Sequence, residues 1–134
     1  GGSSVGTEAS ISLGMRGKKV TVIEMEKQVN LMRTGAFSDL LKMSEENGVT
    51  RMMGWKLIEI KENSVIAENV DTGEKKEIKA DTVLMAVGMK PRVQESMSFW
   101  HCCPETSFMR IGDCNESGDI RDAVWMAFEA ARYI

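Results

Sequence analysis

Apolar residues recur at helical spacing in the first part of the chain. Val5, Ala9 and Leu13 lie four residues apart, which places them on one face of a helix. Gly14 and Gly17 follow directly and are typical of a helix end. The pattern therefore predicts an amphipathic helix from about residue 5 to residue 13.

The next apolar runs are short and rich in β-branched residues. Residues 20–23 form a run of the kind that lies in the middle of a parallel sheet, and residues 49–53 form a second one. Between them we expect a helix from about Gly35 to Glu46, with Asn47-Gly48 as its C-terminal stop. Its predicted apolar face comprises Phe37, Leu40, Leu41 and Ser44. The order strand, helix, strand predicts a βαβ unit.

From Trp55 onward the period of the pattern changes. Residues 55–61, 64–70 and 74–79 are three short strand candidates. Glu62-Asn63 and Asp71-Thr72-Gly73 separate them, and both are turn sequences. This part of the chain is predicted to form an antiparallel β-meander packed on one face.

The remaining segments mix apolar runs with irregular sequence. Residues 81–87 predict a central strand that delivers Gly88 at its carboxyl end, and residues 108–111 predict a last short strand. Residues 92–107 show no clear period and are predicted to be a connecting loop. A final helix is expected after Asp119. Its predicted apolar side comprises Ile120, Ala123, Val124, Ala127 and Ala131.

Composition narrows the class of protein. At 134 residues, with 43% hydrophobic and 28% charged residues, the chain fits one soluble globular domain. A net charge of −3 without a basic stripe excludes nucleic acid as the expected partner, and no signal peptide or long apolar segment indicates a membrane. Three cysteines, at 102, 103 and 114, cannot form a secreted disulfide framework, so we expect a cytoplasmic protein. No spacing predicts a catalytic group or a metal site.

The first 24 residues contain most of a dinucleotide-binding fingerprint. With Gly6 as the third glycine of GxGxxG, Gly1 is the first, and Glu24 follows Gly6 by 18 residues. Ser3 occupies the middle glycine position, where a side chain can crowd a pyrophosphate. The leading strand of the unit is absent because the chain begins at the turn. An alternative is that residues 1–4 are a vector-derived linker, but a linker does not account for Gly6, Glu8 and Glu24 together.

Two further glycines lie where a nucleotide could bind. Gly88 follows the predicted central strand, and ligands of open α/β sheets bind outside the carboxyl ends of strands. A mere strand-terminating turn is the alternative for Gly88. Gly112-Asp113 precedes the last predicted helix, whose first N–H groups suit a phosphate or an electron-rich ring edge.

These stretches together resemble the flavoproteins with two dinucleotide-binding domains, the pyridine-nucleotide disulfide oxidoreductase superfamily. Residues 1–8 with 20–24 look like the NAD(P)H half, residues 86–92 look like the crossover to the FAD domain, and Ile111-Gly112-Asp113 looks like the final flavin motif. The ending from Gly112 to Arg132 is similar, more narrowly, to the NADH:flavin oxidoreductases related to 2,4-dienoyl-CoA reductase, which carry an FMN-bearing, old-yellow-enzyme-like barrel.

The resemblance implies a Rossmann-like α/β fold and a role for each matched residue. Residues 1–90 would be an NAD(H)-binding domain without its first strand, and residues 91–134 the C-terminal segment of a split FAD-binding domain. Glu24 would accept from the adenosine ribose, and the absence of an adjacent arginine favours NADH over NADPH. Asp113 would accept from an FAD ribityl hydroxyl, with Ile120 and Arg121 near the pyrimidine edge of the flavin. The residues that would line the pyrophosphate are Gly1, Ser3, Ser4, Val5 and Gly6.

The same resemblance implies that the chain is the C-terminal part of a longer enzyme. Electrons in that parent would pass from NADH to FAD, through an iron–sulfur cluster to FMN, and on to an enoate-type or other acceptor. The expected partners are the dinucleotides, the missing N-terminal portion and other copies of the chain, because an absent strand exposes sheet edges. This chain alone is expected to lack catalytic competence. A stand-alone nucleotide-binding regulatory domain and a folded fragment without activity remain open alternatives.

Overall fold

The chain forms two compact units, Gly1–Val87 and Gly88–Ile134. The computed structural model describes residues 1–28, 37–104 and 107–132. The predicted start of the second helix near Gly35 lies outside these residues.

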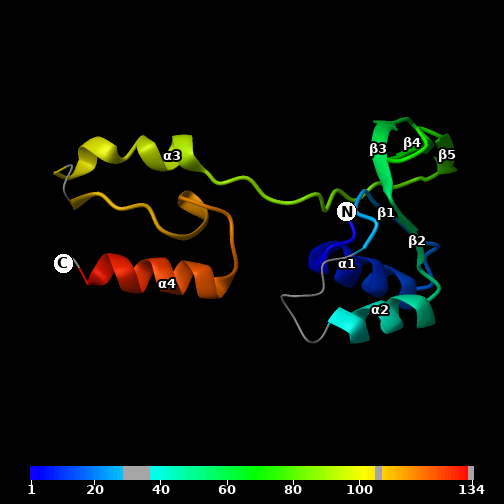
Figure 1. Cartoon of the computed structure of the whole chain (residues 1–134), viewed down its shortest axis with the longest axis horizontal. Coiled ribbons are helices and arrows are strands. Elements are labelled where there is room, and N and C mark those ends of the chain that lie inside the picture. The colour runs from blue at the N-terminus through cyan, green and yellow to red at the C-terminus, as the bar shows by residue number, and fades with distance from the viewer. Residues whose placement is uncertain (29–36, 105–106, 133–134) are drawn as a thin grey trace. The chain divides into compact units, whose positions relative to one another are not determined.

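The first unit begins with a helix and a parallel strand pair. Helix α1 spans Ser4–Met15, strand β1 Thr21–Glu24, helix α2 Phe37–Glu46 and strand β2 Thr50–Met53. Strands β1 and β2 pair in parallel, with Val22 opposite Arg51. Helices α1 and α2 pack side by side next to the strands (Figure 1). The predicted βαβ order is confirmed.

The antiparallel meander is also confirmed. Strands β3 (Trp55–Ile60), β4 (Ser64–Asn69) and β5 (Lys75–Lys79) form a sheet in that order. The side chain of Asn69 accepts from the backbone N–H groups of Asp71 and Thr72, which fixes the second turn. Figure 1 shows the meander on the opposite side of β1 and β2 from the two helices.

The core of the first unit is small and comes from both sheets and α1. Ala67 is fully buried in β4, and so are the polar side chains of Thr7 and Ser44. Ser44 lies in α2 on its predicted apolar face, so a small polar side chain is part of this buried core. The buried hydrophobic residues are Ile11, Val22, Val49, Val65 and Ala67.

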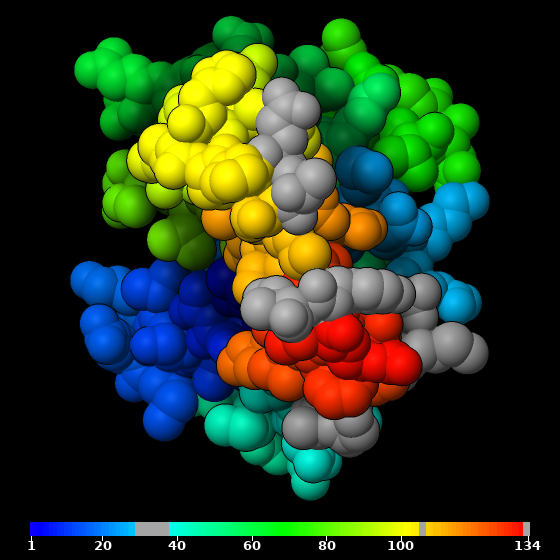
Figure 2. Space-filling view, turned by 90° about the vertical axis from the view of Figure 1, so that its left-hand side faces the viewer, coloured from blue at the N-terminus to red at the C-terminus, as the bar shows by residue number. Residues whose placement is uncertain are grey.

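The second unit is mostly helical. Helix α3 spans Val93–Met97, two 3-10 turns span Trp100–Cys102 and Gly112–Cys114, and helix α4 spans Ile120–Ala131. The segment that carries the second turn runs between α3 and α4, drawn in orange between yellow and red in Figures 1 and 2. The N–H of Arg92 donates to the carbonyl of Asp113 at 3.1 Å and joins the start of α3 to this segment.

Two predicted strands are not formed. Residues 81–87 and 108–111 make no strand ladder with any part of the chain that the structure describes. Leu84 and Met85 are 60% and 56% exposed. The apolar pattern identified residues that favour a sheet, but a strand also needs a partner for its backbone groups. Gly88 therefore does not follow a paired central strand.

The predicted loop at residues 92–107 contains helix α3 instead. Arg92 pairs with Glu95 across one helical turn, and the Ser96 hydroxyl donates to the Val93 carbonyl at 2.8 Å. Such contacts are local and leave no apolar period, which explains why the pattern missed the helix.

Helix α4 also differs from its predicted orientation. Ala123 and Ala127 are half-buried, but Ile120 and Val124 are 84% and 62% exposed. Among the described residues, no helix is both long enough and apolar enough to span a membrane.

Candidate dinucleotide-binding site

The turn before α1 is built around glycines that leave no room for a side chain. A Cβ atom on Gly6 would lie 1.9 Å from the carbonyl oxygen of Gly1. A Cβ atom on Gly1 would lie 2.0 Å from the carbonyl oxygen of Ala86. The backbone of the turn can therefore lie directly against the helix and against residue 86 only because both positions are glycine.

Both backbone groups of Gly2 are hydrogen-bonded by side chains. Its N–H donates to the Glu24 carboxylate at 2.5 Å. Its carbonyl accepts from the Arg51 guanidinium at 2.9 Å and from the Thr7 hydroxyl at 3.0 Å. Arg51 also donates to the Thr7 hydroxyl at 3.1 Å. The turn is thus held by residues from α1, β1 and β2.

Glu24 at the end of β1 is half-buried and charged. Partial burial acts to raise its pKa, but hydrogen bonds from the N–H groups of Glu26 and Gly2, together with the charge of the N-terminal amine and the N–H of Met25, outweigh burial and lower the pKa below 4.5. Burial lowers the pKa of the Arg51 guanidinium, while the Glu24 carboxylate acts in the opposite direction. An ionised carboxylate has about four acceptor sites, so two backbone N–H bonds leave capacity for ribose hydroxyls.

The first turn of α1 presents backbone donors. The N–H of Thr7 donates to the Ser3 carbonyl at 2.9 Å and makes the first hydrogen bond of the helix. The N–H groups of Ser4, Val5 and Gly6 lie before this bond and are not used within the helix. The first turn of α1 contains no acidic residue. Ser3, the helix cap, is exposed and has an ordinary φ of −69°. This end of the helix favours an anion such as a pyrophosphate.

The structure brings six of the predicted site residues together at this turn. They are Gly1, Ser3, Ser4, Val5, Gly6 and Glu24. Gly88, Gly112, Asp113, Ile120 and Arg121 belong to the second unit.

The predicted flavin residues of the second unit surround the start of α4. The Asp113 carboxylate accepts from the N–H of Gly118 at 3.2 Å. The Asp119 carboxylate accepts from the N–H of Asp122 at 3.0 Å, and the Asp122 carboxylate accepts from the N–H of Asp119 at the same distance. Arg121 pairs with both carboxylates, at 3.6 and 3.9 Å. The helix start is therefore partly capped, whereas we expected open N–H groups there.

Two residues that hold the turn, Arg51 and Thr7, were not predicted from the sequence. Arg51 is a cation within the short parallel strand 50–53, a position that usually holds an apolar residue. Thr7 is completely buried in α1. A charged residue inside a predicted buried strand was the available signal that Arg51 has a polar partner.

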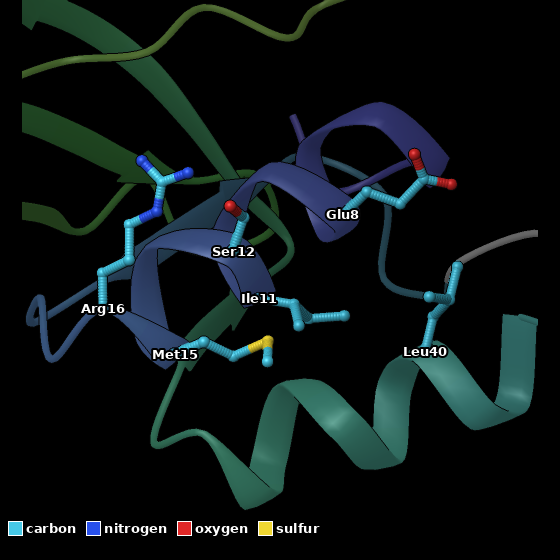
Figure 3. Close-up of a pocket in the computed structure, with 6 residues that line it drawn as sticks. All are labelled: Glu8, Ile11, Ser12, Met15, Arg16 and Leu40. Atoms are coloured by element: carbon cyan, nitrogen blue, oxygen red, sulfur yellow. The ribbon is translucent and has the colours of Figure 1, made fainter.

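A shallow pocket of about 420 Å³ lies apart from the turn, between α1 and α2. Figure 3 shows Ile11 and Met15 pointing toward α2, while the guanidinium of Arg16 points away from it. The pocket is lined by Glu8, Ile11, Ser12, Met15, Arg16 and Leu40. It is an apolar seam between two helices, and only Glu8 belongs to the predicted fingerprint.

A glycine turn at a helix start, with a carboxylate at the end of a parallel strand, defines a dinucleotide-binding α/β domain. Comparison of the sequence with protein families gives the same class of protein. The chain belongs to the pyridine nucleotide-disulphide oxidoreductase family, whose domain matches residues 1–99. Membership implies binding of a flavin and a nicotinamide dinucleotide.

Known relatives are much longer than this chain. It is 27% identical, over its full length, to cinnamate reductase of Clostridium sporogenes, of which it spans 20%. Among solved structures, 2-naphthoyl-CoA reductase matches 100% of the chain with a TM-score of 0.83 at 21% identity, and the chain spans 20% of it. Thioredoxin reductase of T. acidophilum matches 98% of the chain with a TM-score of 0.71 at 22% identity, and the chain spans 49% of it. These likenesses confirm the predicted α/β fold class.

Proposed function

We propose that the first unit binds NADH at the turn before α1. The observation that carries this proposal is the close packing of Gly1 and Gly6, which brings the backbone of the turn against the helix start. A pyrophosphate at that start would meet the N–H groups of Ser4, Val5 and Gly6 and the positive end of the helix dipole. NADH supplies a hydride when it is bound, and these residues hold and orient it.

The acidic surroundings of the ribose position favour NADH over NADPH. Glu24 is half-buried and ionised at neutral pH, and Glu26 follows two residues later in an exposed bend. Both terminal nitrogens of Arg51 donate to protein oxygens, which hold this cation against the Gly2 carbonyl. A 2′-phosphate beside Glu24 and Glu26 would therefore meet two carboxylates.

In the second unit, the start of α4 is the proposed flavin side of the protein. Asp113 lies in the 3-10 turn before this helix and would accept from a ribityl hydroxyl of FAD. Ile120 and Arg121 begin the helix and would lie near the pyrimidine edge of the ring. Gly112 has a φ of +59°, which favours glycine, and a Cβ atom on it would lie in van der Waals contact with Ala123 of the helix. Gly88 is proposed to approach the dinucleotides.

We propose that the full protein is an NADH:flavin oxidoreductase related to 2,4-dienoyl-CoA reductase. NADH would give a hydride to FAD, its two electrons would pass singly through an iron–sulfur cluster to FMN, and an enoate-type acceptor would take up those two electrons and two protons. Similarity to a cinnamate reductase and to a naphthoyl-CoA reductase supports this class of acceptor. This chain spans about a fifth of those relatives and is proposed to supply nucleotide binding without complete catalysis. A cytoplasmic location is consistent with this role.

A calorimetric titration of the chain with NADH and with NADPH tests the proposal. We expect NADH to bind, NADPH to bind more weakly, and Glu24→Ala to weaken NADH binding by roughly tenfold or more, because a charged hydrogen-bond acceptor is lost. Glu45→Ala, at an exposed position of α2, is the matched control. No heat with either nucleotide, from a chain with native helix content, would exclude a nicotinamide site in the isolated chain.

A further inference from the structure

The peptide groups on both sides of the Gly2 α-carbon are fixed by side chains from other elements. Glu24 accepts from the Gly2 N–H at 2.5 Å, and Arg51 and Thr7 donate to the Gly2 carbonyl at 2.9 and 3.0 Å. A Cβ atom on Gly2 would lie 2.8 Å from the Arg51 guanidinium. Arg51 and Glu24, which bind the Gly2 backbone, therefore also leave little room for a side chain at this position.

Arg51 and Thr7 also bind each other, which makes the contact a triangle. Thr7 is completely buried, and its hydroxyl donates to Gly2 while it accepts from Arg51 at 3.1 Å. Arg51 lies on β2 opposite Val22 of β1, so its backbone position is fixed by the sheet. Thr7 and Gly2 are buried and Arg51 is half-buried, and a hydrogen-bond network is rigid when every member has its partner.

We propose that Arg51 and Thr7 are positioning residues that set the orientation of the glycine turn for the nucleotide. This inference rests on the proposed NADH site and deepens it. A carbonyl oxygen that pointed toward the pyrophosphate would repel it, whereas N–H groups attract it. Arg51 and Thr7 hold the carbonyl of Gly2 on the protein side of the turn. The N–H groups of the following residues are then left to face the anion.

A second role for Arg51, binding a 2′-phosphate directly, requires different contacts. Its two terminal nitrogens both donate to protein oxygens, at 2.9 and 3.1 Å. These bonds use two of the five guanidinium N–H donors and hold the group against the Gly2 carbonyl, so a phosphate would have to reach the remaining donors at that place. The two roles predict different nucleotide preferences for an Arg51 variant, so titration separates them.

The experiment compares Arg51→Met, Arg51→Lys, Thr7→Val and Thr7→Ser with a matched control, Arg16→Met, in which an exposed arginine is replaced. NADH affinity is measured by titration, and the exchange of the backbone amides of residues 2–6 by NMR. We expect Arg51→Met to weaken NADH binding roughly tenfold and to speed amide exchange in the turn by a similar factor. Thr7→Val should cause a smaller loss, and Thr7→Ser, which keeps the hydroxyl, should restore it.

Two results would overturn the inference. The first is that the backbone amides of the turn exchange at the same rate in Arg51→Met and Thr7→Val as in the control, Arg16→Met. The second is a loss of NADPH binding in Arg51→Met with NADH binding unchanged, which would make Arg51 a phosphate ligand. If the unsubstituted chain binds no NADH, the proposed function fails, but the exchange rates still decide whether Arg51 and Thr7 orient the turn.

Discussion

The Glu24 carboxylate accepts a hydrogen bond from the backbone N–H of Gly2 at 2.5 Å, across 22 residues of sequence. This bond ties the end of β1 to the turn before α1. The residue proposed to accept from the ribose is thus also a support of the turn proposed to receive the pyrophosphate. Changes at Glu24 should therefore affect stability as well as nucleotide binding.

The lowered pKa of Glu24 makes the free energy of unfolding depend on pH in the acid range. Because the folded state binds a proton at Glu24 less readily than the unfolded state, the unfolded chain takes up more protons as the pH falls. The stabilisation is complete above the unfolded pKa of about 4.5 and is lost as the pH falls through the lower folded pKa. Glu24→Gln should therefore flatten the loss of unfolding free energy below pH 4.5, measured by urea denaturation over a pH series.

Glu62→Gln is the control for this pH series, because Glu62 is exposed in the turn between β3 and β4. It should leave the acid dependence as in the unsubstituted chain. An equal acid dependence in Glu24→Gln and the unsubstituted chain would contradict the role assigned to the Gly2 and Glu26 hydrogen bonds.

Nucleotide preference should respond to the charge at Glu26. Glu26→Arg removes one carboxylate beside Glu24 and introduces a guanidinium, which suits a 2′-phosphate. We expect the ratio of NADPH to NADH affinity to rise by roughly tenfold, measured by calorimetry. Glu45→Arg in α2 changes the net charge equally and should leave the ratio unchanged. A similar rise in both variants would show that only overall charge matters.

Gly6→Ala should destabilise the chain, although it lies in a helix. In an ordinary helix, alanine is favoured over glycine by about 1 kcal/mol. Here the new Cβ atom would lie 1.9 Å from the Gly1 carbonyl oxygen, so the turn must move. We expect a net loss of roughly 1–3 kcal/mol of unfolding free energy, together with weaker NADH binding. Ser12→Ala, at an exposed position of the same helix, should not destabilise. Wild-type stability in Gly6→Ala would argue against close packing of the turn.

The elements predicted correctly from the sequence are those with local contacts and those whose strands pair with another strand of this chain. Helix α1, the pair β1 and β2, the meander and the grouping of Gly6 with Glu24 all followed from spacing and turn residues. The strand predicted at residues 81–87 is not formed, because an apolar run indicates only a preference for a sheet, while a strand also needs a partner strand. Arg51 was missed because its partners, Gly2 and Thr7, lie more than 40 residues away in sequence.

Helix α4 depends on its reciprocal cap. Asp119 accepts from the N–H of Asp122 and Asp122 accepts from the N–H of Asp119, both at 3.0 Å. Asp119→Ala removes one of these bonds and should cost about 1 kcal/mol of helix stability. Amide exchange in the first turns of α4 should then accelerate by roughly fivefold, as measured by NMR. Glu116→Ala, just before the cap, is the control. Unchanged exchange in Asp119→Ala would show that tertiary contacts alone hold the helix start.

Residues 82–87 should drive self-association of the chain. Val83, Leu84, Met85 and Val87 are between 37% and 68% exposed in an extended segment that has no strand partner among the described residues. Such a segment can pair with a strand of a second copy. We expect concentration-dependent dimers or larger species in sedimentation velocity, and a shift toward monomer when Leu84→Lys and Met85→Lys are combined. Exposed apolar residues of α4, among them Val124, are the alternative contact surface, and Val124→Lys tests it. A monomer at all concentrations would contradict the prediction, and dissociation caused by Val124→Lys alone would place the contact on α4 instead.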